Sequence, residues 1–83
     1  MAKRELYGTA SCAYTRELCE WLEWRGREFV EYDVESDEAA LMRLCELTGE
    51  RVPVMVPVLV EDGRVAQVGW QGRGCVVRAH VQS

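Results

Sequence analysis

The sequence lacks any uninterrupted apolar stretch close to the roughly 20 residues that a transmembrane helix needs. Residues 1–8 include two basic side chains but no apolar segment of the kind found in a secretory signal. Positive charge is also scarce, because 10 Lys and Arg oppose 14 Asp and Glu and leave a formal net charge of −4. We therefore expect a cytoplasmic protein that binds neither a membrane nor a nucleic acid.

Linkers, internal repeats and low-complexity segments are absent as well. The 83 residues are therefore expected to form a single domain over 1–83. The segment 76–83 has only a weak apolar pattern, and we expect it to be poorly ordered.

Four cysteines are present, and their spacing decides which roles they can have. Without export they lie in a reducing compartment, where thiols are reactive, metal-bound or buried more often than they form structural disulfides. Structural zinc sites use closely paired ligands, whereas the cysteines here are separated by longer gaps, at positions 12, 19, 45 and 75. No metal site is predicted, so the question becomes which cysteine carries chemistry.

Hydrophobic periodicity predicts alternating strands and helices. The expected elements are strands at 5–7, 29–34, 58–60 and 65–68, a helix at 14–25, and a second helix that Ser36 or Asp37 caps and Gly49 ends. The first strand–helix–strand unit predicts two parallel strands with a right-handed crossover. Asp62-Gly63 predicts a tight hairpin that adds two antiparallel strands. The predicted fold class is therefore α/β, in the order β-α-β-α-β-β.

Cys12 lies between the first predicted strand and the first predicted helix. Unpaired N–H groups and the positive end of the helix dipole at that place lower the pKa of a thiol and favour the nucleophilic thiolate. The hydroxyl of Thr15, one helical turn further on, is expected to donate a hydrogen bond to that thiolate. Position alone predicts that Cys12 is the reactive cysteine.

The segment Cys12-Ala13-Tyr14-Thr15 follows a predicted strand, and Met55-Val56-Pro57 precedes the hairpin. Together they resemble the glutaredoxin branch of the thioredoxin-like fold, in which a Cys-Pro-Tyr-Cys or Cys-x-x-Ser motif faces a cis-proline. The resemblance implies a cis Val56–Pro57 bond that presents the backbone of Val56 to a thiol substrate. Pro53 is the competing candidate, but only Pro57 leads directly into a strand.

The resemblance implies a thioredoxin-like, mixed four-stranded sheet with flanking helices. The family's third helix is expected to be short or absent, because little of the chain follows Cys75. The segments 24–26, 58–64 and 68–75 are most similar to the UXX-star glutaredoxin-like group. That group often carries selenocysteine at the position of Cys12, so Cys12 is either a natural cysteine or a substitute for selenocysteine.

Three departures from the family pattern narrow the expected mechanism. Thr15 replaces the second cysteine of the motif and excludes a Cys-x-x-Cys mechanism. Thr9 stands where the family has a basic residue for the glutathione carboxylate, and no aspartate follows the glycines at 69–74. The co-substrate is therefore expected to be glutathione or another small thiol, with no tightly bound cofactor.

The resemblance also implies roles for residues outside the motif. Cys75 lies near the family's glycine pair and is expected either to resolve a mixed disulfide on Cys12 or to have no role. Cys19 and Cys45, at the edges of apolar helix faces, are expected to pack as small hydrophobic residues. The residues expected to bind substrate are Tyr14, Val56, Pro57, Trp70 and Gly72.

The leading hypothesis is a monothiol thiol–disulfide oxidoreductase that acts as a monomer on small thiols and disulfide-containing proteins. One alternative is an iron–sulfur cluster protein, which Ala13-Tyr14 disfavours because such proteins usually have a small glycine after the cysteine. The other alternative is a non-catalytic thioredoxin-like adaptor, in which Cys12 would react slowly with alkylating reagents.

Overall fold

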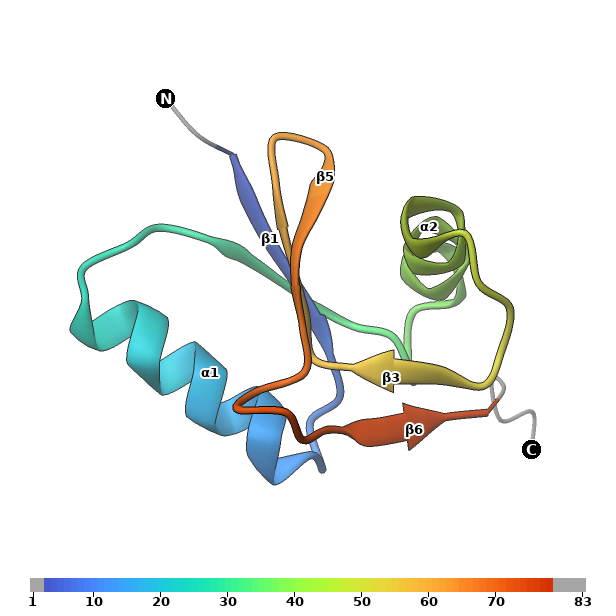
Figure 1. The fold of residues 1–83 in the computed structure, drawn as a ribbon, viewed down its shortest axis with the longest axis horizontal. Helices are drawn as coiled ribbons and strands as arrows, with labels where there is room; N and C mark the ends of the chain where they lie inside the picture. Colours follow the sequence, from blue (N-terminus) through green and yellow to red (C-terminus); the bar gives the residue numbers. More distant parts are fainter. Residues whose placement is uncertain (1–2, 79–83) are drawn as a thin grey trace.

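The computed structural model describes residues 3–78, and Figure 1 shows its two helices on opposite sides of a central group of strands. In chain order the elements are β1 (Arg4–Gly8), α1 (Ala13–Trp24), β2 (Val30–Asp33), α2 (Glu38–Thr48), β3 (Val54–Val56), β4 (Val58–Glu61), β5 (Arg64–Val68) and β6 (Cys75–Val77). Within residues 3–78, neither helix is long and apolar enough to cross a membrane.

The central sheet has four strands in the order β2-β1-β4-β5. β1 is parallel to β2 and antiparallel to β4, and β4 and β5 form the hairpin. Asp62 and Gly63 have φ angles of 53° and 79°, the positive values that a two-residue hairpin turn requires. The predicted α/β class, the mixed four-stranded sheet and the tight turn are confirmed.

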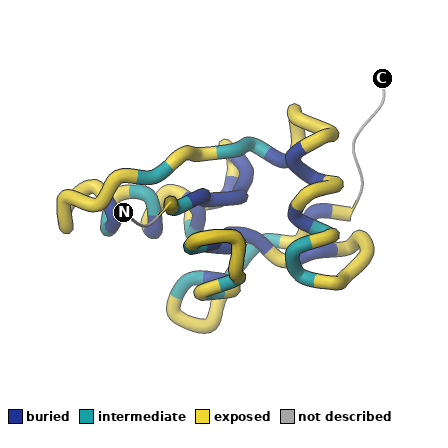
Figure 2. Tube along the Cα trace, turned by 90° about the horizontal axis from the view of Figure 1, so that it is seen from above, coloured by how far each residue is buried: buried dark blue, intermediate teal, exposed yellow. Residues whose placement is uncertain are grey.

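The two faces of β1 bury different apolar clusters, because successive side chains of a strand point to opposite sides. Leu6 packs with Leu18 and Leu22 on the α1 side. Tyr7 packs with Leu41 and Leu44 on the α2 side. All six are almost fully buried, and each buried leucine contributes about 1.5–3 kcal/mol to stability. Figure 2 shows the buried residues gathered in the middle of the molecule, with exposed loops around them.

The second helix has the ends that its sequence predicts. Of the two candidate caps, Asp37 is the one that acts, since its carboxylate accepts a hydrogen bond from the backbone N–H of Ala40 at 3.1 Å. Gly49 ends the helix in the left-handed conformation with φ 72°. Both boundaries of α2 are therefore determined locally, by the Asp37 side chain at its start and by the backbone conformation of Gly49 at its end.

A second, two-stranded sheet of β3 and β6 lies beyond the predicted four-stranded sheet. Sequence analysis assigned no strand to either segment, because prolines interrupt the apolar run around β3 and few residues surround β6. The pairing is antiparallel, with Val54 opposite Val77 and Val56 opposite Cys75. The pairing buries Val54, Val56 and Val77 in the cluster on the α2 side. Because neither three-residue segment would form a stable strand alone, this mutual burial explains why both are strands.

The expectation for the chain end is corrected by the same pairing. Val76 and Val77 belong to β6, so weak order does not begin at residue 76, and residues 79–83 lie outside the described residues. As expected, no helix follows α2 in the described part of the chain. A β-strand therefore occupies the place after Cys75.

Gly8 lies where β1 meets α1, and its backbone touches the side chain of Thr15. A Cβ atom at Gly8 would lie 2.6 Å from the Oγ1 of Thr15 and closer still to its methyl group. Thr15 is only 1% exposed, so its short side chain has no room to move aside. The absence of a side chain at Gly8 allows the first turn of α1 to lie against the end of the sheet.

We expect Gly8→Ala to lower the free energy of unfolding by about 1–3 kcal/mol, because the added methyl group overpacks the contact with Thr15. Urea denaturation of the purified protein measures the effect. In a Thr15→Ala background, where the two nearest opposing atoms are gone, the same change at Gly8 should cost much less. An equal cost in both backgrounds would show that this contact is not the cause.

Candidate active site

Cys12 lies at the N-terminus of α1 as predicted. It is the N-cap residue, with extended φ and ψ of −87° and 118°, and its side chain forms no capping hydrogen bond. The backbone N–H of Cys12 donates to the carbonyl of Thr9 at 3.2 Å, which forms the tight turn between β1 and α1. The first turn of α1 contains no acidic side chain. The unpaired N–H groups there favour a negative charge on the Cys12 sulfur when it is reduced.

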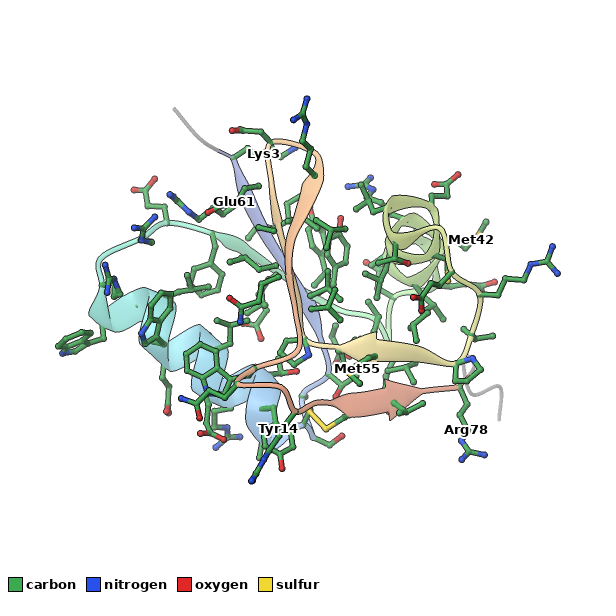
Figure 3. The ribbon with its side chains drawn as sticks, in the orientation of Figure 1. Lys3, Tyr14, Met42, Met55, Glu61 and Arg78 are labelled. Carbon is green, nitrogen blue, oxygen red and sulfur yellow. A yellow bond between two sulfur atoms is a disulfide. The ribbon has the colours of Figure 1, made fainter. Side chains whose placement is uncertain are left out.

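Cys75 is bonded to Cys12 in a disulfide, although 63 positions separate the two in sequence. Their Cα atoms lie 6.1 Å apart, within the usual range for a disulfide. Figure 3 draws this sulfur–sulfur bond at the N-terminal end of α1, beside the start of β6. The structure thus brings the predicted nucleophile and the predicted resolving thiol into direct contact.

Thr15 is placed differently from the expectation for its hydroxyl group. Its side chain is buried against Gly8, and the Oγ1 atom has no hydrogen-bond partner. The predicted hydrogen bond to the Cys12 sulfur is therefore absent in this disulfide-bonded form. The inward face of α1 includes Thr15, whereas Tyr14 is only half-buried.

Val56 and Pro57 lie next to the disulfide because β3 pairs with β6. Val56 is opposite Cys75 in that pairing, and both Val56 and Pro57 are buried. The Val56–Pro57 peptide bond is cis, as the resemblance implied. The Val52–Pro53 bond is also cis, so the two prolines are not alternatives as the sequence had suggested.

Trp70 and Gly72 belong to a tight turn between β5 and Cys75. Backbone hydrogen bonds of 2.7 and 2.9 Å join Trp70 and Arg73 across this turn, and Gly72 has a positive φ of 77°. The N–H of Gly69 donates to the carbonyl of Pro57 at 2.6 Å and ties the turn to the proline segment. Trp70 also packs on Trp21 of α1, with 5.6 Å between the ring centroids.

The predicted site residues therefore come from three separate parts of the chain, one of which, the segment with Val56, pairs directly with Cys75. Tyr14 lies two positions after Cys12, at the same end of α1 as the disulfide in Figure 3. Val56 and Pro57 come from the segment around β3, and Trp70 and Gly72 come from the turn before β6. Gly8 was missed by sequence analysis, although a glycine directly before a predicted active-site loop could have indicated a close approach.

A shallow pocket of about 290 Å³ opens beside Cys12. Cys12 itself is only 2% exposed while it is bonded to Cys75. The pocket is lined by the turn after β1 and by the first two turns of α1, namely Ala10, Ser11, Cys12, Ala13, Arg16, Glu17 and Glu20. Among residues 3–78, no group of three or more His, Cys, Asp or Glu side chains is placed to hold a metal ion.

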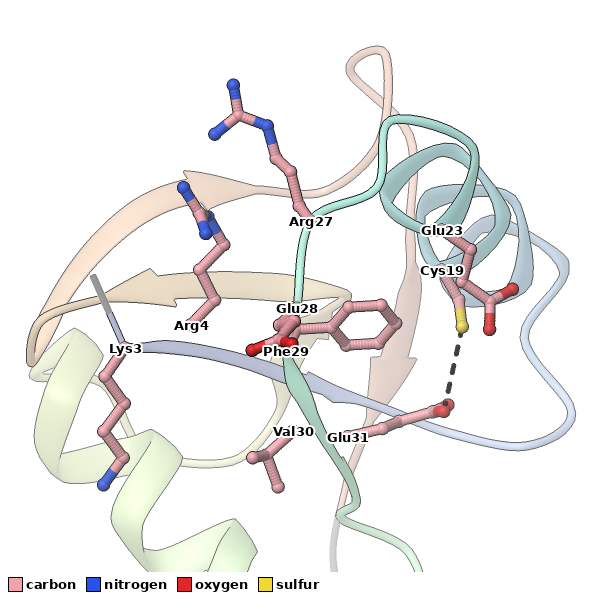
Figure 4. Close-up of a pocket in the computed structure, with 9 residues that line it drawn as sticks. All are labelled: Lys3, Arg4, Cys19, Glu23, Arg27, Glu28, Phe29, Val30 and Glu31. Atoms are coloured by element: carbon pink, nitrogen blue, oxygen red, sulfur yellow. Dashed lines mark hydrogen bonds between the residues drawn. The ribbon is translucent and has the colours of Figure 1, made fainter. Parts of the chain in front are cut away.

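The two remaining cysteines are free and half-buried. Cys45 packs against the α2-side cluster and Cys19 against the α1-side cluster, as expected. The Cys19 thiol donates to the carboxylate of Glu31 at 3.8 Å, a contact drawn in Figure 4. Burial and then the negative charge of Glu31 raise the pKa of Cys19 to about 11. Cys19 is therefore a poor nucleophile at neutral pH.

We expect Glu31→Gln to speed the alkylation of Cys19 by iodoacetamide at mildly alkaline pH. Removing the negative charge lowers the pKa of Cys19, and below that pKa the thiolate fraction rises on the order of tenfold for each unit by which it falls. Peptide mass mapping of the oxidised protein distinguishes Cys19 from Cys45. Glu46→Gln, on the exposed side of α2, is the control and should leave the rate unchanged, whereas an unchanged rate in Glu31→Gln would refute the coupling.

Comparison with known proteins agrees with this geometry. The solved structure of glutaredoxin 1 from Francisella tularensis, a complex with cacodylate, has the same fold. It is 21% identical, has a TM-score of 0.57, and the match covers 84% of this chain and 85% of the other. No curated protein sequence matches significantly. The sequence pattern of the glutaredoxin family matches residues 5–65, which is most of the chain. This chain therefore belongs to the glutaredoxin family.

Proposed function

We propose that the protein is a thiol–disulfide oxidoreductase in which Cys12 is the nucleophile and Cys75 the resolving thiol. The observation that carries this proposal is the disulfide between the helix N-terminus and the start of β6. Membership of the glutaredoxin family supports the reaction type. The position of Cys12 at the end of α1 supports its role as the attacking sulfur, because the helix dipole stabilises a thiolate.

The reaction consists of two exchanges between sulfur atoms. The Cys12 thiolate attacks one sulfur of a substrate disulfide, forms a mixed disulfide and expels the other sulfur as a thiolate, which takes a proton from solvent. The Cys75 thiolate then attacks the Cys12 sulfur, forms the observed protein disulfide and releases the second substrate thiol. The substrate disulfide gains two electrons, and the pair Cys12 and Cys75 loses them.

Two equivalents of a small thiol complete the cycle. The first forms a mixed disulfide with one of the two cysteines and frees the other, and the second displaces it as the small-molecule disulfide, so that Cys12 and Cys75 regain two electrons. We propose glutathione or another small thiol for this role. Thr9, at the position of the family's basic residue, is 4% exposed and leaves that position without a positive charge. The pocket beside Cys12 is lined instead by side chains of both charges, among them Arg16 and Glu17. This composition supports a broader thiol specificity than glutathione alone.

The proposed substrate contacts are with the residues that meet around the disulfide. The backbone of Val56, held by Pro57, lies beside Cys75, and Trp70 and Gly72 lie in the turn that leads to it. Tyr14 flanks Cys12 on α1. A monomeric state, a cytoplasmic location, the absence of a tightly bound cofactor and the relation of Cys12 to selenocysteine in the UXX-star group stay predictions.

Substitution of Cys12 should block the first exchange with the substrate, and substitution of Cys75 should block only the second. We expect Cys12→Ser to reduce activity on hydroxyethyl disulfide to the uncatalysed rate, because serine is a far weaker nucleophile than a thiolate. Cys75→Ser should retain the first exchange and accumulate a mixed disulfide on Cys12, which intact mass spectrometry detects. Cys45→Ser is the matched control and should complete both exchanges. Full activity of Cys12→Ser would refute the proposal.

Reduction of the Cys12–Cys75 disulfide should also lower stability. A crosslink that spans 63 positions restricts the unfolded chain and stabilises the folded state by about 4 kcal/mol in the chain-entropy description. We expect urea midpoints measured with and without a reductant to differ in the wild type. The midpoint of Cys75→Ser should be the same under both conditions. A reductant effect of equal size in Cys75→Ser would show that the disulfide is not responsible.

A further inference from the structure

One largely exposed stripe of α1 runs from the redox-active end of the helix to its other end. Each of its members lies three or four positions from at least one other member, so they share one side of the helix. From the Cys12 end onward the stripe has a small residue, then two acidic ones and then two aromatic ones: Ala13, Glu17, Glu20, Trp21 and Trp24. Trp24 is 81% exposed, an unusual state for so large an apolar side chain.

The turn before β6 forms the opposite wall of a groove along this stripe. Trp70 and Gln71 enclose, with Trp21 and Trp24, a hollow of about 320 Å³. This hollow and the pocket beside Cys12 have Glu17 and Glu20 in common. The two hollows therefore lie next to each other along α1, and we call them together the Cys12–Trp70 groove.

The charge of the groove changes along its length. Arg16 lines only the Cys12 end, whereas Glu17 and Glu20 are the charged side chains that line the half with the tryptophans. The guanidinium of Arg25 lies beside that half, over the ring of Trp21. Neither carboxylate forms an ion pair within residues 3–78. Two carboxylates beside the exposed indole ring of Trp24 favour a cation, because both the negative charge and the face of an aromatic ring attract it.

The protein itself shows how a cation binds to this cluster of rings. The guanidinium group of Arg25 lies 5.0 Å from the ring centroid of Trp21. Trp21 in turn packs against Trp70. Trp24 is exposed on the same stripe of the helix, so its ring is available to a cation supplied by another molecule.

We propose that the Cys12–Trp70 groove binds a basic segment of a disulfide-containing protein substrate, with one arginine or lysine held by Glu17, Glu20 and the exposed indole of Trp24. This inference rests on the proposed function and specifies its substrate class. Glu20 is about 12 Å from Cys12 along the helix axis at 1.5 Å per residue. An extended peptide covers that length in roughly three to four residues. The basic residue is therefore placed three or four positions from the target cysteine.

The test uses two short peptides that differ only in charge. Each has a central cysteine, as a mixed disulfide with thionitrobenzoate, and either arginine or glutamate at roughly the third position on both sides. Reduced Cys12 attacks the peptide sulfur and expels thionitrobenzoate, whose absorbance gives the second-order rate constant. Cys75 then displaces the peptide thiol, so that the protein is oxidised and the mixed disulfide is reduced to two thiols.

We expect the arginine peptide to react about tenfold faster than the glutamate peptide, from two exposed ion pairs and one cation–π contact. The double variant Glu17→Gln and Glu20→Gln should reduce this ratio to about twofold or less. Glu46→Gln and Glu50→Gln together remove the same charge from exposed positions outside the groove and should preserve the ratio. Trp24→Ala should slow the arginine peptide more than the glutamate peptide.

The possible failures are distinguishable. Equal rates for the two peptides, or the same ratio in both double variants, would overturn the inference while Cys12 still reacts. Failure of both peptides to release thionitrobenzoate faster with the wild type than with Cys12→Ser would overturn the proposed function itself. A faster glutamate peptide would assign the opposite charge preference to the groove and would also overturn the inference.

Discussion

The pairing of β1 with two neighbours is the interaction on which the rest of the structure depends. β1 hydrogen-bonds to β2 on one edge and to β4 on the other, so its backbone polar groups are satisfied in the middle of the sheet. Its side chains then bury one cluster against α1 and another against α2. Because β1 ends at Gly8, four positions before Cys12, the same strand also determines where the reactive sulfur is held.

The disulfide joins two layers that secondary structure alone leaves separate. Cys12 belongs to the start of α1, which packs on the four-stranded sheet, whereas Cys75 belongs to β6 of the two-stranded sheet. The turn at 69–73 leads directly into this bond and carries Trp70 onto α1. The disulfide, the packing of Trp70 on α1 and the position of the last described strand are therefore linked through one short segment of the chain.

Prediction from sequence succeeded where the signal is local. Asp62-Gly63 requires positive φ at both positions, Asp37 can satisfy a free N–H at a helix start, and Cys12 directly precedes a helix. It failed where the cause is a contact between distant segments. The strands β3 and β6 are three residues each, too short to stand out by periodicity, and only their mutual pairing makes them strands. The burial of the Thr15 side chain likewise depends on a contact that periodicity does not encode, namely the approach of Gly8.

The sequence by itself determined the alternation of strands and helices, the tight hairpin and the place of Cys12 at the start of a helix. These properties follow from backbone propensity and from hydrophobic periodicity, which act over a few residues. Only the tertiary structure decided that Cys75 is the partner of Cys12, and that an acidic and aromatic groove leads away from them. Those outcomes depend on distances between residues far apart in the chain, which packing sets and periodicity does not encode.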